Sequence, residues 1–459
     1  MSFVEPVFFA FLLAVAALCR LAPTARSQNA VLLLASLVFY GWREPWWSLL
    51  LILSVTVDWW AARAVQASAS RRPLWISVVV NLSLLGTYKY ADFIVDAVDR
   101  ALQALGGPAV SWRPALPLPP GISFFTFQSM AYTIDASRGV VDARRSWIDV
   151  GAHVAAFPQL VAGPIERASD LLPQLERRRT PDWTDRVAGM ELLLWGAVQK
   201  LVVADMVGLW VDAVFADPNA APVRVWAAVV GFMVQILADF SGYTDLARGS
   251  ARVLGIHLSA NFDRPFLAAS PSEFWRRWHQ TFSRWMHDYV YIPLGGSRRG
   301  AVRMAFAASV SLILAGLWHG AAWNFVAWGG WFAVVWLAWR AGAAGIPEGV
   351  KRRARPIGVV LTWIVVAVGM LLFREPDLTR SAAVLAQIPW TGGESDRVVA
   401  SGVLGVALAG GAILIAGGAL FRQRARLSYV GRGLAWAAGV VMIAVFWADS
   451  ARDFVYFQF

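Results

Sequence analysis

The sequence predicts an all-α protein that crosses a membrane many times. Hydrophobic residues make up 58% of its 459 residues and charged residues only 15%, whereas soluble domains carry about 45–50% and about 25%. The aromatic content of 13% excludes a disordered chain. The 25 tryptophans agree with a membrane protein, because the indole ring favours the membrane–water interface.

Apolar runs of near-spanning length define the predicted elements. About eleven transmembrane helices are expected, at Pro6–Cys19, Val31–Trp42, Trp46–Trp60, Leu74–Tyr88, Val187–Leu209, Val225–Phe240, Met304–Leu317, Trp323–Trp339, Pro356–Phe373, Val398–Phe421 and Gly433–Trp447. Met1–Pro6 has no basic residue, so the first run is expected to be a mature membrane helix and not a signal peptide.

The stretch Met304–Trp339 contains no charged residue over 36 positions. As one helix it would be about 54 Å long, well beyond a hydrocarbon core of about 30 Å. We therefore predict a turn within Trp318–Asn324, where His319 and Gly320 interrupt the apolar run. The Ala- and Gly-rich run Leu404–Leu420 is expected to be a helix that packs closely through small residues.

The middle of the chain, Leu116–Gly300, is mostly short segments rich in Gly, Pro and charged residues. Irregular backbone at membrane depth must be buried in protein or line a wet cavity. We therefore expect spans mixed with re-entrant or interfacial helices. The predicted organisation is one membrane domain, 1–459, with N-terminal spans at 1–115, a core at 116–330 and C-terminal spans at 331–459.

Basic residues predict the orientation and the partners of the surface. The net charge is +11, from 41 basic and 30 acidic residues, and the basic ones cluster in short loops. Such loops set the orientation of membrane proteins and bind anionic lipid headgroups. We therefore expect the partner of the basic residues to be a lipid bilayer and not a nucleic acid. Placing these loops in the cytoplasm puts the N-terminus outside. They lie at Arg20, Arg26, Arg63, Arg71, Arg72, Arg177–Arg179, Arg298–Arg299, Lys351–Arg355 and Arg422–Arg426.

His319 lies between two uncharged runs. Polar groups inside a membrane are expensive and are functional candidates by default. One interpretation is a histidine that bonds a backbone carbonyl at a helix bend. The other is a general base in an internal cavity, because imidazole has an ordinary pKa near neutrality.

His279 falls on a second predicted helix. Ser270–Glu273 is typical of a capping box with Pro at the first helical position. His279 borders an aromatic stripe, and it belongs either to an interfacial amphipathic helix or to a catalytic site. The stripe has spacings of 3 and 4 and is made of Trp275, Trp278, Phe282, Trp285 and Tyr289. On another face Arg284 and Asp288 are spaced to pair.

Other embedded polar residues are expected to pair or cap inside the bundle: Asp58, Asp135, Glu191, Lys200, Asp205, Asp239 and Asp245. A transporter could use such groups, but the runs show no internal symmetry. His153 and His257 are interpreted as structural. With the single cysteine Cys19 and no metal, nucleotide or serine-hydrolase motif, no metal site is expected.

Four motifs, in order, resemble the membrane-bound O-acyltransferase family, and within it the alginate O-acetylase branch. They are Pro119–Phe124 with Phe127–Gln128 and Tyr132–Asp135; Phe157–Ile165; Asp239–Asp245 with Asn261–Phe262, Phe274–His279 and Asp288–Gly296; and Leu317–Gly320. The ending Tyr456–Phe459 is similar to the alginate branch. His287 departs from the pattern, because relatives often carry Arg there, and Arg284 is a candidate to compensate.

The resemblance implies a ring of tilted and re-entrant helices around a central tunnel. It places the family's principal catalytic histidine at His319 and its second at His279. His319 would act as general base or carry the acyl group, and His279 would orient it or stabilise charge. Residues expected to bind substrate are Asn324, Tyr243, Asp245, Arg284, Tyr289 and Trp323, with Asn324, Tyr243 and Tyr289 as candidate oxyanion donors.

The predicted function is acyl transfer, of an acetyl group, from a cytoplasmic donor such as acetyl-CoA to an exported polysaccharide such as alginate. No tightly bound cofactor is expected. The resemblance also implies a bacterial inner-membrane location and a periplasmic acetyltransferase partner of the SGNH type. Alternatives are O-acetylation of peptidoglycan, D-alanylation of another envelope polymer, a transporter, and a non-enzymatic scaffold.

Overall fold

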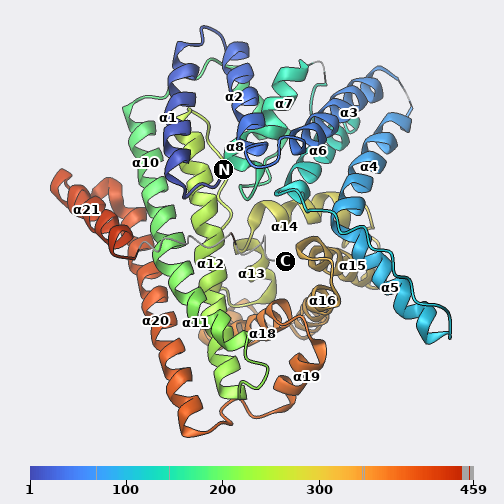
Figure 1. Ribbon diagram of the computed structural model, residues 1–459, viewed down its shortest axis with the longest axis vertical. Helices are drawn as coiled ribbons and strands as arrows, with labels where there is room; N and C mark the ends of the chain where they lie inside the picture. Colours follow the sequence, from blue (N-terminus) through green and yellow to red (C-terminus); the bar gives the residue numbers. More distant parts are fainter. Residues whose placement is uncertain (69, 144, 344, 346, 447–453, 455–459) are drawn as a thin grey trace. The chain divides into compact units, whose positions relative to one another are not determined.

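The computed structural model describes residues 1–459 except 69, 144, 344, 346, 447–453 and 455–459. In this described part every regular element is a helix and none is a strand, which confirms the predicted all-α fold (Figure 1). Trp447, where the last predicted span ends, and the motif Tyr456–Phe459 lie outside the described residues.

The chain forms two compact units. Unit 1 contains Met1–Leu192 and Leu246–Ser259, and unit 2 contains Leu193–Asp245 and Ala260–Phe459. The helices of unit 1 are α1 (Pro6–Leu21), α2 (Ala25–Tyr40), α3 (Trp47–Ala67), α4 (Arg72–Leu85), η1 (Gly86–Tyr90), α5 (Ala91–Ala104), α6 (Ile122–Ser137), α7 (Trp147–Ala155), α8 (Phe157–Leu160) and α9 (Ala168–Leu175). Two helices, α10 (Trp183–Ala197) and α12 (Pro222–Val253), contribute residues to both units.

Unit 2 contains both candidate catalytic histidines. Its other helices are η2 (Val198–Ala204), α11 (Asp205–Phe215), η3 (Pro265–Leu267), α13 (Pro271–Arg277), α14 (Gln280–Met286), η4 (His287–Tyr291), α15 (Ala301–His319), α16 (Trp323–Ala343), α17 (Glu348–Arg353), α18 (Arg355–Arg374), α19 (Leu378–Ala386), α20 (Glu394–Gln423), η5 (Arg424–Arg426) and α21 (Tyr429–Phe446).

Eight helices of the described chain are long and apolar enough to cross a membrane. They are Trp47–Ala67, Arg72–Ala104, Trp183–Phe215, Pro222–Val253, Ala301–His319, Arg355–Arg374, Glu394–Gln423 and Tyr429–Phe446. The other three predicted spans are also helical, as α1, α2 and α16, but they are not among the eight, so the number eleven is not confirmed.

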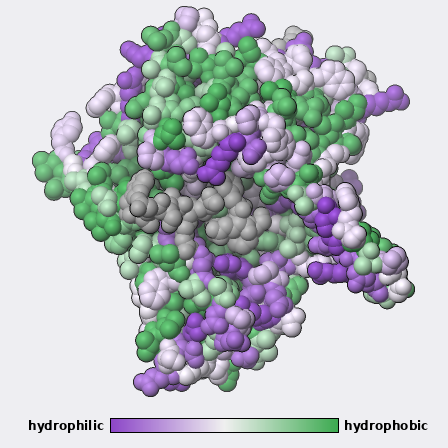
Figure 2. Space-filling view, in the orientation of Figure 1, coloured by the Kyte–Doolittle hydropathy of each residue, from purple (hydrophilic) through white to green (hydrophobic). Residues whose placement is uncertain are grey.

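Large apolar side chains are exposed on these helices, as a lipid-facing surface requires. Leu13, Leu34, Leu408 and Ile415 are examples, each more than 60% exposed. Figure 2 shows hydrophobic residues at the surface over much of the face in view. The structure therefore has the character of a polytopic membrane protein.

The core of unit 1 contains a buried carboxylate that joins three helices. Asp58 on α3 accepts hydrogen bonds from Ser77 and Asn81 on α4 and from Ser129 and Thr133 on α6. Four donors match the four lone-pair sites of a carboxylate, so all acceptor sites of Asp58 are bonded. This confirms that the embedded Asp58 is paired inside the bundle.

The uncharged stretch of unit 2 folds back as predicted. The helix α15 ends at His319 and α16 begins at Trp323, so the turn falls within the predicted Trp318–Asn324. A Cβ atom added to Gly329 of α16 would lie 2.5 Å from the carbonyl oxygen of Leu312 on α15. Only glycine permits this close approach, which sets the position of His319 at the end of α15.

The Ala- and Gly-rich helix α20 also packs through a small residue. A Cβ on Gly410 would lie 3.0 Å from a methyl group of Val203 in η2. The close packing predicted for Leu404–Leu420 is thus confirmed at this position.

Candidate active site

His319 is the last residue of α15 and is 3% exposed. Aromatic rings surround its imidazole. Trp328 lies 5.2 Å away between ring centroids and Phe373 lies 5.3 Å away, both edge to face. Phe282 lies at 5.7 Å and the neighbouring Trp318 at 5.0 Å. The imidazole is therefore enclosed by rings from α14, α15, α16 and α18.

His279 is 1% exposed and lies between α13 and α14. The single helix predicted through this segment is wrong, because the chain breaks at Trp278 and His279. His279 has φ 41° and ψ 55°, in the left-handed region, and α14 starts after it. A non-glycine residue in this conformation is uncommon and is found preferentially at functional sites.

The break is imposed by the chain at Asn261–Asp263. The N–H of Asp263 donates to the carbonyl of Arg277 at 3.0 Å, and the N–H of Gln280 donates to the carbonyl of Asn261 at 2.9 Å. The Asn261 Oδ1 atom also accepts from the N–H and the hydroxyl of Thr281, at 3.3 and 2.7 Å. His279 is thus tied on both flanks, which overrides the helical pattern of the sequence.

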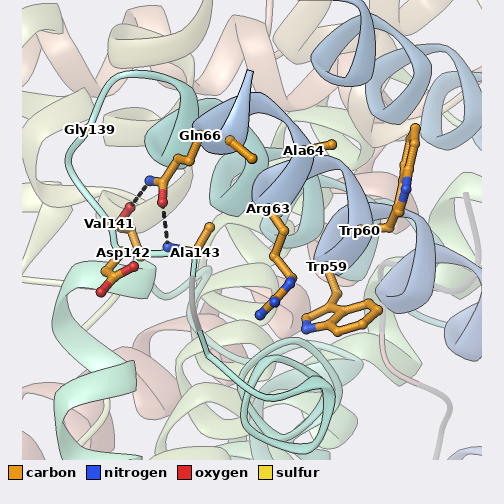
Figure 3. Close-up of a pocket in the computed structure, with 10 residues that line it drawn as sticks. Trp59, Trp60, Arg63, Ala64, Gln66, Gly139, Val141, Asp142 and Ala143 are labelled. Carbon is orange, nitrogen blue, oxygen red and sulfur yellow. Dashed lines mark hydrogen bonds between the residues drawn. The ribbon is translucent and has the colours of Figure 1, made fainter. Parts of the chain in front are cut away.

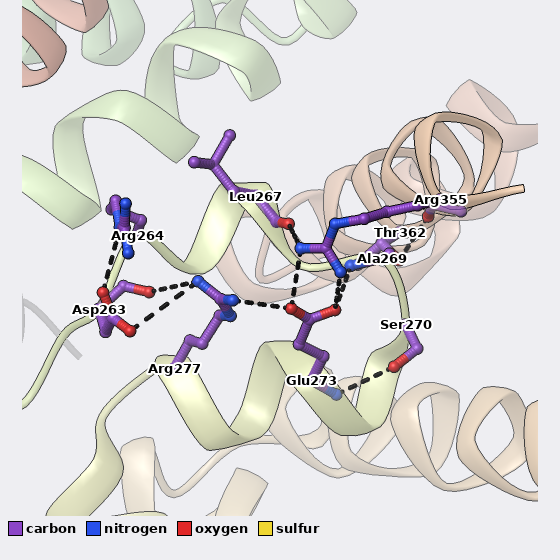
Figure 4. A network of polar contacts seen from close by, with 10 residues as sticks. Asp263, Arg264, Leu267, Ala269, Ser270, Glu273, Arg277, Arg355 and Thr362 are labelled. Atoms are coloured by element: carbon purple, nitrogen blue, oxygen red, sulfur yellow. Dashed lines mark hydrogen bonds and ion pairs between the residues drawn. The ribbon is translucent and has the colours of Figure 1, made fainter. Parts of the chain in front are cut away.

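The Ser270 half of the predicted capping box of α13 is confirmed, whereas the Glu273 carboxylate bonds the N–H of Ala269 in place of that of Ser270 and belongs to an ionic network. The Ser270 hydroxyl accepts from the N–H of Glu273 at 3.1 Å. The Glu273 carboxylate accepts from the N–H of Ala269 and pairs with Arg277 at 2.8 Å and with Arg355 of α18 at 3.1 Å (Figure 4). Burial opposes ionisation of Glu273, but the Ala269 N–H and Arg355 hold the pKa of this carboxyl below its usual value.

The two histidines share one aromatic wall. The Phe282 ring stacks on His279 with centroids 5.0 Å apart, and Trp318 lies 5.8 Å from the same imidazole. Because Phe282 and Trp318 also contact His319, the structure brings His279 and His319 to the same pair of rings. Phe240 of α12 also contacts His279, with ring centroids 4.7 Å apart.

His279 lies in a junction between helices of seven residues, outside the eight candidate spans. Burial lowers the pKa of its imidazole to about 3. The ring is therefore neutral at physiological pH and can act through hydrogen bonds but not as a cation.

The predicted substrate-binding residues lie in different surroundings. Asn324 of α16 is 3% exposed, and its Nδ2 donates to the carbonyls of Leu372 and Phe373 at 3.3 and 3.2 Å. Tyr243 of α12 is 4% exposed and packs on Phe454 at 4.5 Å between ring centroids. Asn324 thus contacts Phe373, which lies against His319. Tyr243 contacts Phe454, which in turn contacts Phe240 beside His279.

The remaining four candidates are less enclosed. Asp245 accepts from Gln199 at 3.0 Å, and Tyr289 packs on Trp285 at 5.1 Å between ring centroids. Arg284 is exposed, and Trp323 is 48% exposed at the start of α16. Their roles in substrate binding stay predictions.

A buried ionic cluster lies next to Tyr243, on η2, α11 and α12. Lys200 is 1% exposed, and its Nζ lies 2.7 Å from Asp205 and 2.8 Å from Asp239. Lys200 also faces the ring of Tyr243 at 5.7 Å. The expectation that these embedded charges pair inside the bundle is confirmed.

Unit 1 contains a separate cavity of about 870 Å³, at the end of α3. Gln66 fixes its rim by donating to the Val141 carbonyl at 2.6 Å and accepting from the Ala143 N–H at 2.9 Å (Figure 3). Trp59, Trp60 and Arg63 line the wall, and none of the predicted site residues does. Within the described residues, no cluster of His, Cys, Asp and Glu could hold a metal.

Sequence reasoning missed Phe240, Phe373 and Trp328 as walls of the histidine site. They come from helices far apart in sequence, and aromatic residues are equally typical of lipid-facing surfaces. In the sequence, Asn261 stands out only as part of a motif. Its place directly before an aromatic residue in irregular chain gave no signal that it would cap α14.

Comparison with known proteins shows which family the chain is similar to. A model of the membrane-bound O-acyltransferase family matches residues 136–373, which include both histidines. A Pseudomonas aeruginosa protein named probable alginate O-acetylase AlgI is 38% identical over 361 residues, covering 77% of this chain and 68% of the relative. The protein of that name from Azotobacter vinelandii is 37% identical over 389 residues, 82% of this chain and 76% of the relative.

A relative with another acceptor in its name is also similar. The peptidoglycan O-acetyltransferase of Helicobacter pylori is 30% identical over 335 residues, which cover 65% of this chain and 62% of the relative. The relatives thus share O-acetyl transfer in their names and differ in the polymer.

Proposed function

The chain belongs to the membrane-bound O-acyltransferase family, and we propose that it transfers an acetyl group from a cytoplasmic thioester to a hydroxyl of exported alginate. The protein is a membrane-embedded O-acyltransferase. The choice of acetyl and alginate is supported by the names of the relatives at 38% and 37% identity. Peptidoglycan, or a D-alanylated polymer, is the alternative acceptor that the experiment below distinguishes.

The observation that carries the mechanism is the pair of buried imidazoles on one aromatic wall. His319 takes the proton of the acceptor hydroxyl while that oxygen attacks the acyl carbonyl. The new C–O bond forms, the C–S bond breaks, and the leaving thiolate takes the proton from His319, so His319 returns to its starting state. The rings around His319 exclude water, which would otherwise hydrolyse the thioester.

His279 supports this step as a neutral group. Its imidazole can donate one hydrogen bond and accept another, and the tie to Asn261 fixes its direction. In this proposal His279 orients the substrate or stabilises the charge that develops on it. The donor, for which acetyl-CoA is our candidate, is a substrate, and no tightly bound cofactor takes part.

We further propose a bacterial inner-membrane location with the N-terminus outside. Support comes from the basic residues near the helix ends, which begin with Arg20 in the last turn of α1 and Arg26 in the first turn of α2. We also propose a periplasmic partner in the cell, an acetyltransferase of the SGNH type that acts on the exported polymer.

The test is the acetyl-ester content of exported polymers in cells whose own gene is replaced by variants. His319→Ala is expected to reduce alginate acetylation about 10²–10⁴-fold, because the acceptor hydroxyl loses its general base. His257→Ala is the control, since this side chain is 54% exposed and bonds Asp185 in unit 1. Normal alginate acetylation in His319→Ala would overturn the mechanism. If the variant lost acetyl esters from peptidoglycan alone, peptidoglycan and not alginate would be the acceptor.

A further inference from the structure

An indole N–H beside His319 has no hydrogen-bond partner among the described residues. It belongs to Trp328 of α16, whose side chain is 2% exposed. The Trp328 ring lies 5.2 Å from the His319 imidazole between centroids, with the planes at 81°. Most buried donors in proteins are bonded. The indole N–H groups of Trp47, Trp226 and Trp275 are also unpaired among the described residues, and Trp328 is singled out by its ring contact with His319.

Asn324 cannot supply the donor that acyl transfer needs at this place. It lies one helical turn before Trp328, on the same face of α16. Its Nδ2 group is already used on the carbonyls of Leu372 and Phe373. The atom it has left without a partner is Oδ1, which repels negative charge. Of these two side chains, only Trp328 has an N–H available.

We propose that the Trp328 Nε1–H donates to the carbonyl oxygen of the acyl donor and stabilises the oxyanion that forms during attack. The inference rests on the proposed function and adds a catalytic residue to it. A buried donor left unpaired is unfavourable in the resting protein, because it has lost its hydrogen bonds to water. The bond made only as charge develops would recover that cost in the transition state, which is where it accelerates the reaction.

The same helix offers a matched control. Trp331 also lies on α16, but its Nε1 donates to the carbonyl of Val365 at 2.9 Å. Trp331→Phe therefore removes a structural hydrogen bond, whereas Trp328→Phe removes a donor with no structural partner. Trp328→Phe keeps most of the buried ring area at its site.

The experiment measures steady-state transfer of labelled acetyl from acetyl-CoA to alginate oligosaccharide by the purified full chain. Trp328→Phe is expected to lower kcat about 10²-fold, as loss of an oxyanion donor does, with KM within about 3-fold. Trp331→Phe should keep kcat and lower only the thermal midpoint. A kcat for Trp328→Phe within about 3-fold of the wild type would overturn the inference.

Two further arms keep the inference testable. If Trp328→Phe does not fold, 3-benzothienylalanine at position 328 preserves the ring shape, lacks the N–H, and must show the same loss of kcat. If the wild type does not use acetyl-CoA, that donor assignment fails, and the ester content of exported polymer still compares Trp328→Phe with Trp331→Phe. Equal ester content in the two variants would contradict a role for the Trp328 N–H.

Discussion

His279 shows how one residue's backbone can define a site. Its left-handed conformation costs roughly 1–2 kcal/mol for an L-residue. The bonds of Gln280 and Thr281 to Asn261 hold it there. Asn261 is therefore a positioning residue for His279, acting through the backbone and the cap of α14.

Asn261→Ala is expected to cost about 1–2 kcal/mol of stability, as the loss of a helix cap does, and to lower kcat by about 10²-fold through displacement of His279. Asn261→Asp keeps the Oδ1 acceptor and should recover most of kcat. The measurement is kcat, KM and thermal midpoint for each variant.

Ser270→Ala is the control, because it removes the cap of α13 and leaves the Asn261 bonds intact. It should lose similar stability and keep kcat. If Ser270→Ala and Asn261→Ala lowered kcat equally, the effect of Asn261 would be one of general stability and its positioning role would be refuted.

The hairpin formed by α15 and α16 positions His319 in the candidate site. Its close approach at Gly329 fixes where α15 presents His319. Gly329→Ala must separate the two helices, because the new Cβ would lie 2.5 Å from the Leu312 carbonyl and 2.7 Å from Ile313 Cα. We expect a loss of about 1–3 kcal/mol and a fall in kcat.

The neighbouring Gly330 is the matched comparison. A Cβ there meets nothing within 4 Å in the described residues, and alanine favours a helix over glycine by about 1 kcal/mol. Gly330→Ala should therefore keep kcat and match or exceed the wild-type thermal midpoint in detergent. Equal destabilisation by the two substitutions would show that backbone contact at Gly329 does not set the hairpin.

Elements that follow from local pattern were predictable from sequence. The turn at Trp318–Asn324 is predictable because the uncharged stretch, as one helix, would be longer than the bilayer is thick. The cap of α13 is predictable from Ser270 and Glu273. The break at His279 was not predictable, because the aromatic spacing stays helical through it. There the residues at Asn261–Asp263 override local preference with tertiary hydrogen bonds.

The candidate site was predictable only in part. The sequence motifs predict His279 and His319 as catalytic residues, and the structure shows that both contact the Phe282–Trp318 wall. Asn324 was expected as a donor, but its N–H groups serve the end of α18. That assignment depends on partners 48 and 49 residues away, which no local pattern reveals.

At the scale of the whole molecule, the charge pattern predicts orientation. With Cys19→Ser as background, a cysteine at Glu44, in the loop after α2, should react with an impermeant maleimide in intact cells. A cysteine at Ser70, in the loop after α3, should react only after permeabilisation. Both positions are exposed. The reversed labelling pattern would place the N-terminus inside.

We propose above all that this membrane protein makes an ester bond at His319. The most direct measurement reconstitutes the full chain in proteoliposomes with labelled acetyl-CoA and alginate oligosaccharide, and compares the wild type with His319→Gln. The wild type should place label in alkali-labile ester on the oligosaccharide, and His319→Gln should place none above background. Ester formation at the wild-type rate by His319→Gln, or passage of label across the bilayer without any ester, would contradict the claim.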